Sequence, residues 1–434
     1  MLIYTIKECN RIKYIFKLYF QELLGIVISF TTNSEEFIAY QDIKINYSEQ
    51  ELSDEIFFCS SNILFETNIR EQNCKFINFD NEVAFFAVTN KKSYMPFDPF
   101  AAGFYLVTRY EEYLPYIKDQ YGRFSADQSI AYKNYFLKKP LINIWALKIA
   151  SIIKDKYPDF KISNNTFQFI PTLDIDCAYA YKLKGIIRSV GGYSKSFIKL
   201  NFKDIIERTK VLSGFGKDHF DTYDFQHEMQ QKYKLHPIYF ILYAEYGDFD
   251  KNIPLNNSKF HSLIKMLNDE ADVGIHPSYA SNKDIKVLKK EIEMLSKVLN
   301  RQITKSRQHF LKLDLPHTYR NLIDLDITDD YTMGYASEIG FRASICSSFY
   351  FYDLELDIET NLKIHPFAFM EGTLRDYLNI HADKALNHIK PLIDEVKAVN
   401  GTFICLWHNE SLSNQYRWVG WQEVYEQTIK YALK

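Results

Sequence analysis

From about residue 166 onward, short apolar runs alternate with longer amphipathic stretches. The apolar runs are typical of buried strands, and the stretches between them carry apolar residues at helical spacing. The predicted strands are Phe167–Leu173, Ile238–Tyr243, Asp272–His276, Lys305–Leu313, Phe341–Cys346, Leu362–Phe369 and Thr402–Trp407. The predicted helices are Tyr223–Lys234, Lys259–Leu267, Lys283–Leu299, His317–Ile323, Asp376–Asn400 and Gln422–Leu433. Repeated strand–helix units predict a parallel sheet or barrel, and about seven units favour an α/β fold with a (β/α) barrel.

Residues 1–165 lack this rhythm and mix short strands with helices. The predicted strands there are Ile26–Thr31, Glu36–Tyr40, Glu55–Cys59 and Val83–Val88, and the predicted helices are Phe100–Tyr110 and Leu141–Lys154. A chain of 434 residues is too long for one ordinary core. We therefore predict a smaller α+β domain at 1–165 and the α/β domain at 166–434. No charge constellation in the first domain suggests chemistry, so we expect packing or partner binding there.

The segment 181–217 interrupts the alternation and reads as a helical insertion. Between Lys182 and Lys217 it carries nine Lys or Arg residues against two acidic ones. Its apolar residues include Ile186, Ile187 and Phe197. Two interpretations stay open: a solvated insertion, or peripheral contact with an anionic surface such as lipid headgroups or a charged glycan carrier.

Composition excludes several classes of protein. A net charge of −3 gives no support for nucleic-acid binding. The six cysteines are scattered and form no Cys-x-x-Cys pair, which fits a reducing compartment. The first residues lack the apolar core of a signal peptide, and no run of 18 or more apolar residues exists. We expect a cytoplasmic protein.

The most informative segment is Phe167–Tyr179, where an apolar run ends in two carboxylates. Asp174 and Asp176 are two apart, so an extended chain points both side chains to the same side. Two like charges this close are costly unless a cation or a shared proton relieves them. A metal site is one interpretation; the other is a helix N-cap made by either aspartate.

Polar residues also follow other apolar runs. They are His276, Arg307, His309, Arg342 and His408. A single histidine at a strand end is usually a hydrogen-bonded structural residue. In a parallel barrel, however, all these endings would face the same rim, where barrel enzymes carry their active sites.

These endings resemble, in order, the motifs of the polysaccharide deacetylase superfamily, the carbohydrate esterases with NodB homology. The matching segments are Thr172–Asp176, Gly274–Ser278, Ser306–His309, Gly340–Arg342 and Leu406–His408. The resemblance implies a distorted (β/α) barrel of about seven strands. Residues 1–165 resemble an uncharacterised domain often found ahead of such barrels in bacterial proteins, through FDPFAAGFYLVTRYEEY and YGRFSADQS.

The resemblance also implies one divalent metal ion, for which we expect zinc, and an N-acetylated saccharide as substrate. Asp176 and His276 match two ligands of the family, but its second histidine falls at Ala280. Because a catalytic zinc needs about three protein ligands, we predict His309 as the third. Weaker candidates are Ser281, His317 and Asp314.

The implied chemistry is removal of an N-acetyl group by a metal-bound water. Asp174 would be the general base, Arg307 would hold it in place and ionised, and His408 would be the general acid. Arg342 would support an acidic residue or contact the substrate. Tyr279 and Trp407 would stack on a sugar ring, and structural packing is the alternative for both.

Two functional hypotheses follow. The first is a metal-dependent deacetylase acting on an amino sugar of a bacterial polysaccharide or glycan precursor. The alternative is a non-catalytic glycan-binding or scaffold protein on the same fold, and it is favoured by Ala280.

Overall fold

The computed structural model describes residues 1–161 and 165–434; the residues between these ranges adjoin the predicted boundary at 165/166. The first part of the chain contains a parallel four-stranded sheet of order β2-β1-β3-β4 and an antiparallel β5-β6 pair. Its strands are β1 (Leu2–Thr5), β2 (Ser29–Thr31), β3 (Lys44–Ser48), β4 (Ile56–Cys59), β5 (Ile77–Phe79) and β6 (Glu82–Ala84). Its helices are α1 (Asn10–Phe16), α2 (Ser34–Ala39), α3 (Pro99–Val107), α4 (Ile130–Lys133) and α5 (Leu141–Lys156).

One predicted strand of this part is wrong. Residues Glu36–Tyr40 belong to helix α2 rather than to a strand. The Asn33 side chain accepts hydrogen bonds from the backbone N–H groups of Glu35 and Glu36, which starts the helix. The capped helix therefore takes up the short apolar segment Phe37–Ala39 that was predicted as part of a strand.

The second part of the chain forms a nine-stranded mixed sheet of order β12-β13-β11-β10-β9-β8-β7-β15-β14. All neighbouring pairs are parallel except β12 and β13. The strands are β7 (Gln168–Ile175), β8 (Ile238–Ile241), β9 (Asp272–Ile275), β10 (Lys305–Ser306), β11 (Asp329–Asp330), β12 (Phe349–Asp353), β13 (Ile358–Ile364), β14 (Phe369–Met370) and β15 (Thr402–His408).

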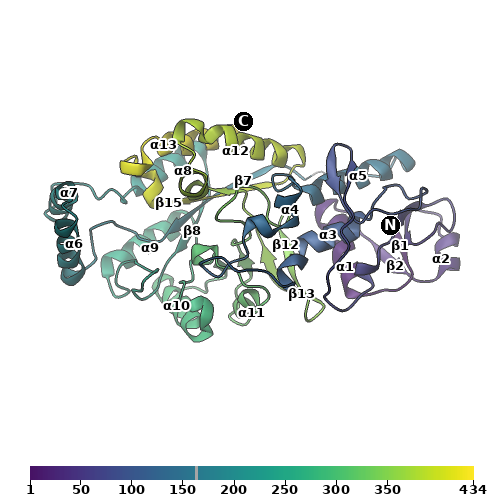
Figure 1. Ribbon diagram of the computed structural model, residues 1–434, viewed down its shortest axis with the longest axis horizontal. Coiled ribbons are helices and arrows are strands. Elements are labelled where there is room, and N and C mark those ends of the chain that lie inside the picture. The colour runs from purple at the N-terminus through teal and green to yellow at the C-terminus, as the bar shows by residue number, and fades with distance from the viewer. Residues whose placement is uncertain (162–164) are drawn as a thin grey trace.

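Helices cover this sheet on two sides. Figure 1 shows α8, α12 and α13 along the top of the sheet and α9, α10 and α11 along the bottom, with the pair α6 and α7 standing apart at the left end. The helices are α6 (Ile186–Ile198), α7 (Phe202–Leu212), α8 (Tyr223–Tyr233), α9 (Ser258–Glu270), α10 (Ile285–Leu299), α11 (His317–Ile323), α12 (Ala382–Ala398) and α13 (Trp421–Leu433). No helix of the described ranges is long and apolar enough to cross a membrane.

The fold is therefore mixed α/β, as predicted, but the barrel is not confirmed. No pairing joins the edge strands β12 and β14 among the described residues, so the sheet is open. The predicted strand Phe341–Cys346 is wrong: the segment is buried but forms turns. Its backbone binds the first part of the chain instead of a sheet, because Phe341 N donates to Leu137 O and Cys346 N to the Asn143 side chain.

The two parts of the chain share a buried ionic cluster. Arg342 donates to both carboxylate oxygens of Glu112, at 2.9 and 2.6 Å, and Arg109 donates to the same carboxylate at 2.8 Å. All three side chains are at most 3% exposed. Arg342 thus joins the two parts, and the prediction that it contacts substrate is corrected. The division at 165/166 itself stays a prediction.

Candidate active site

Four of the predicted site residues lie at the carboxyl ends of neighbouring parallel strands. Asp174 is near the end of β7, and His408 ends β15 directly opposite it in register. His276 follows β9 and Arg307 follows β10. The β9–β10 approach is close, because a Cβ added at Gly274 would lie 2.7 Å from a backbone oxygen of β10. Strand order alone therefore brings these side chains to one edge of the sheet.

Asp174 and Arg307 form a buried ion pair beneath this edge. Arg307 Nη1 donates to Asp174 Oδ1 at 2.9 Å and to Thr172 Oγ1 at 2.7 Å. Both charged side chains are at most 1% exposed. The second carboxylate oxygen, Oδ2, faces His276 Nε2 at 3.7 Å. Arg307 therefore fixes one oxygen of Asp174 and leaves the other directed toward the site.

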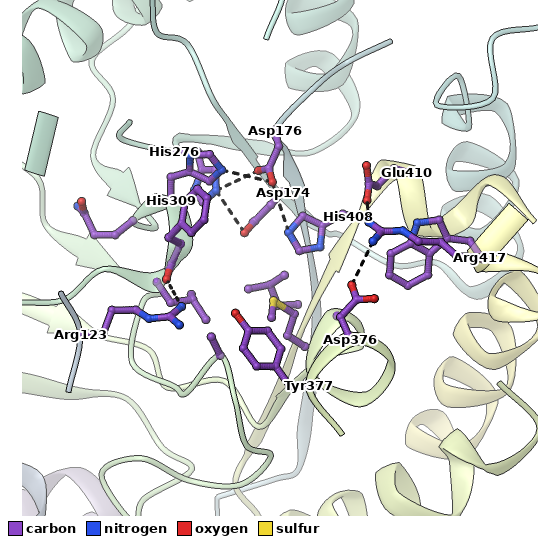
Figure 2. Close-up of a pocket in the computed structure, with 18 residues that line it drawn as sticks. Arg123, Asp174, Asp176, His276, His309, Asp376, Tyr377, His408, Glu410 and Arg417 are labelled. Carbon is purple, nitrogen blue, oxygen red and sulfur yellow. Dashed lines mark hydrogen bonds and ion pairs between the residues drawn. The ribbon is translucent and has the colours of Figure 1, made fainter. Parts of the chain in front are cut away.

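The three predicted metal ligands come together next to this pair. One donor atom from each of Asp176, His276 and His309 lies within 4.8 Å of the other two. His276 Nε2 is 3.2 Å from Asp176 Oδ1, and His309 Nε2 is 3.5 Å from Asp176 Oδ2. Figure 2 shows both imidazoles directed at the Asp176 carboxylate. One carboxylate and two imidazoles are a donor set that suits a divalent transition metal.

Hydrogen bonds at the far nitrogens orient both imidazoles. His276 Nδ1 pairs with the Arg307 carbonyl, and His309 Nδ1 pairs with Asp250 Oδ1 at 2.8 Å. Such partners are typical behind metal-binding histidines, since they leave Nε2 for the ion. Asp176 Oδ1 is buried and accepts no hydrogen bond from any residue of the described ranges. A cation would satisfy this oxygen, so the residues present fit a metal ion.

The charge balance at His309 also favours a cation. Burial alone would lower the pKa of the His309 imidazole, but the carboxylates of Asp176 and Asp250 outweigh it and raise the pKa to about 9. The carboxylates of Asp176 and Asp250 therefore stabilise a positive charge at His309, here the proton of the imidazolium. A metal ion would have to displace that proton.

A strained loop follows His309 and is held by the first part of the chain. Phe310 and Leu311 have φ angles of 60° and 51°, a left-handed conformation that is unfavourable for bulky residues. Arg123 Nη1 donates to the Phe310 carbonyl at 2.8 Å, and Asp119 in turn holds the Arg123 side chain at 2.8 Å. Arg123 also lines the pocket. A residue outside the large sheet thus contributes to the site.

His408 is oriented by a buried glutamate. His408 Nδ1 pairs with Glu371 Oε1 at 2.8 Å, and its Nε2 is 3.7 Å from Asp176 Oδ2. Glu371 is fully buried. Burial alone would lower the pKa of His408, but the carboxylates of Glu371 and Asp176 outweigh it and hold the pKa well above its usual value. The protonated imidazole is therefore the favoured form near neutral pH.

These residues open into a pocket with a volume of about 270 Å³. One part of its wall is apolar and consists of Leu311, Ala336, Met370 and Leu406. The opposite rim is polar: Arg417 bridges Glu410 at 2.6 Å and Asp376 at 3.4 Å, as Figure 2 shows. The pocket can therefore hold a small group that has both an apolar end and hydroxyl groups.

Two further predicted substrate contacts lie elsewhere. Trp407 is fully buried, with its ring 5.1 Å from that of Tyr425, because alternation along β15 points it into the helix layer. Tyr279 donates its hydroxyl to the Tyr121 carbonyl at 3.2 Å and packs on Phe249, outside the pocket lining. The predicted substrate contact of Trp407 is therefore corrected to packing. That of Tyr279, which does not line the pocket, stays a prediction. Ala280 is exposed and carries no donor atom, whereas His309 lies within 4.8 Å of Asp176 and His276, so its role as the third ligand stays a prediction.

Sequence reasoning missed three residues of the site. Glu371 directly follows β14 and is therefore a polar residue at a strand end, as His408 is. The same pattern could have predicted it. Asp250 lies in the long loop after β8, and Arg123 lies far away in the sequence. No spacing rule links either of them to His309.

Comparisons with known proteins add the following. Residues 1–158 match the model of a family of unknown function (DUF7033). Among curated proteins, none matches the chain. Similar solved structures include a putative polysaccharide deacetylase from Mycobacterium smegmatis, with 11% identity, a TM-score of 0.40, and coverage of 62% of this chain and 85% of that one.

Two more structures are similar over the same share of this chain. An allantoinase has 8% identity and a TM-score of 0.38, and 85% of its chain is covered. A CE4 family pseudoenzyme from Bacillus anthracis has 12% identity and a TM-score of 0.30, and 62% of both chains is covered. Identities and scores this low leave the function to be argued from the site itself.

Proposed function

We propose that this protein is a hydrolase that removes N-acetyl groups from an amino sugar of a bacterial polysaccharide or glycan precursor. The observation that carries the proposal is the convergence of three units on one pocket. They are the Asp174–Arg307 pair, the cluster of Asp176, His276 and His309, and the His408–Glu371 pair. The order of the motifs along the sequence supports the same reaction.

Asp176, His276 and His309 would hold a divalent ion, for which zinc is expected. When bound, such an ion supplies Lewis-acid chemistry by polarising an amide carbonyl and making a water molecule more acidic. The remaining work falls to the side chains around it.

Asp174 is suited to act as the general base. Arg307 occupies its Oδ1, so Oδ2 is the atom that would take the proton from the attacking water. The water oxygen forms a new bond to the amide carbon while Arg307 keeps the carboxylate in place. Asp174 is buried, so bulk water competes little for this oxygen.

His408 is suited to act as the general acid. Glu371 holds Nδ1, which leaves Nε2 to deliver a proton to the nitrogen as the C–N bond breaks. Acetate and the free amine are the products, and the two proton transfers balance. The apolar wall of Leu406, Met370 and Ala336 would accept the acetyl methyl group.

The test measures amine release from N-acetylated oligosaccharides by the full chain, together with its metal content. Asp174→Asn keeps the shape but removes the base, so activity should fall by about 10²–10⁴-fold with metal content unchanged. Asp394→Asn, an exposed change on α12, is the matched control and should leave both unchanged. Full activity in the Asp174 variant, or no amine release by the zinc-loaded wild type across the panel, would overturn the proposal.

A further inference from the structure

Helices α6 and α7 form a hairpin that stands away from the rest of the molecule. Figure 1 shows the pair at the end opposite the first part of the chain, beyond α9. The contacts that join α6 to the body include Arg188, which donates to the backbone carbonyls of Lys251 and Asn252. The hairpin therefore exposes far more surface than the helices that cover the sheet.

Several polar side chains of the hairpin lie between its two helices. Asp204 accepts hydrogen bonds from Ser196 and, at 2.7 Å, from Tyr181. Tyr193 and Thr209 share a hydrogen bond of 3.0 Å. Two helices that pack in water normally bury apolar residues between them. This hairpin has the opposite arrangement.

The apolar side chains face outward instead. The most exposed are Ile186 at 83%, Ile187 at 88%, Phe197 at 64%, Ile198 at 80%, Leu200 at 70% and Phe215 at 88%. On α6, the exposed apolar residues share one arc of the helix, because their spacing follows the helical repeat. Single exposed apolar residues are ordinary, but this many on one hairpin indicate an interaction surface.

The charge of the hairpin indicates what covers this surface. Nine Lys or Arg residues lie between positions 182 and 217 against two acidic ones, in a chain whose net charge is −3. Lys195, Lys199, Lys203 and Lys210 are exposed beside the apolar residues. Basic residues next to an exposed apolar face are typical of helices that lie in the interface of an anionic membrane. The same positive charge opposes pairing with a second copy, since a two-fold contact would bring like charges together.

We propose that the α6–α7 hairpin docks on the surface of an anionic lipid bilayer. The apolar residues of α6 and of the turn at Lys199–Asn201 enter the interfacial layer, and the lysines contact lipid phosphates. The Ser196–Asp204 and Tyr193–Thr209 hydrogen bonds stay within the hairpin. The proposal does not rest on the proposed reaction.

Docking places the bilayer beside the pocket. Lys203 Nζ lies 4.9 Å from the centre of the Tyr416 ring, which the His219 ring also contacts. The next two residues, Arg417 and Trp418, line the pocket. A molecule held at the membrane surface would therefore approach the pocket from the side of the hairpin.

The test is cosedimentation of the full chain with vesicles of phosphatidylcholine alone or of phosphatidylcholine with about 30% phosphatidylglycerol. We expect binding to the anionic vesicles only, and weaker binding as salt increases. The double variant Phe197→Ser with Ile198→Ser should reduce partitioning at least ~10-fold. Lys199→Glu with Lys203→Glu should reduce it ~25-fold or more, since each basic residue contributes about fivefold.

The control variant replaces two apolar residues that are equally exposed elsewhere, Val27 at 80% and Ile117 at 81%, by serine. It should bind like the wild type. Circular dichroism checks that every variant keeps its helices. Absence of binding to anionic vesicles, or equal binding by all variants, would overturn the proposal. So would a concentration-dependent dimer, seen by light scattering, that the Phe197 and Ile198 changes abolish, because the surface would then be a contact between copies.

Discussion

Replacing Asp250 by asparagine should weaken metal binding without disturbing the fold. Asp250 is 4% exposed and touches no substrate position; its Oδ1 binds His309 Nδ1 at 2.8 Å. The same carboxylate accepts hydrogen bonds from the backbone N–H groups of Tyr279 at 2.9 Å and Ala280 at 3.4 Å. Asparagine keeps the shape and one acceptor oxygen, so the change removes mainly the negative charge behind the imidazole.

The expected loss follows from that one hydrogen bond. A hydrogen bond to a charged group contributes about 1.5–3 kcal/mol. Losing a carboxylate behind a metal-binding histidine costs about 10–100-fold in affinity, which is about 1.4–2.8 kcal/mol. The two ranges agree, so we expect zinc to bind about 10–100-fold more weakly to Asp250→Asn.

The assay is competition for zinc between the metal-stripped full chain and a chromophoric chelator. Asp248→Asn is the matched control, because Asp248 lies two positions away in the same loop and is exposed. Circular dichroism of the stripped proteins verifies that both variants fold. If Asp250→Asn is folded and binds zinc as tightly as the control, then His309 is not a ligand oriented by Asp250.

Three further predictions concern other parts of the molecule. Glu371→Gln should lower the pKa of His408, so deacetylation should begin to decline at a lower pH than in the wild type; an unchanged pH–rate profile would contradict this. Arg342→Met leaves Glu112 buried with fewer partners and should cost about 3–5 kcal/mol in urea unfolding; a change below about 1 kcal/mol would contradict the role of the cluster. Burial raises the pKa of Glu291 from 4.5 to about 7. The contribution of Glu291 to the free energy of unfolding is therefore fully present below pH 4.5 and is lost as the pH rises through about 7. The total loss is at most about 3 kcal/mol. Glu291→Gln should remove this decline from the unfolding free energy measured across that range.

Most positions of the site were predicted from one rule: polar residues that follow parallel strands lie at the same edge of the sheet. Short strand-like segments located β7, β8, β9 and β15, and polar residues that follow them lie at one edge of the sheet. His309 was predicted as a ligand because Ala280 stands where the resemblance expects a histidine, although His309 lies in a turn after β10 and not on a strand. The positions follow from local patterns and sheet geometry, whereas the roles of the residues came from the resemblance.

The remainder depends on contacts between distant segments, which local patterns do not carry. Phe341–Cys346 has the composition of a strand, but Leu137 and Asn143 take its backbone hydrogen bonds. Arg342 was predicted as a site residue from its place after an apolar segment. Its partner Glu112 lies 230 positions earlier in the sequence, so local patterns could not reveal the pair. The short strands β10, β11 and β14 have two residues each, too few to produce any periodicity.

Arg123 gives the pocket a wall that is encoded far from its reactive groups. Substitutions between Tyr121 and Phe124 can reshape the entrance and the loop of His309 while leaving every strand end of the large sheet unaltered. The side wall of the pocket and its strand-end residues can therefore be altered by separate substitutions, one set in each part of the chain. A fragment without the first part would keep the strand-end residues but lose Arg123 from the pocket and from the Phe310 carbonyl.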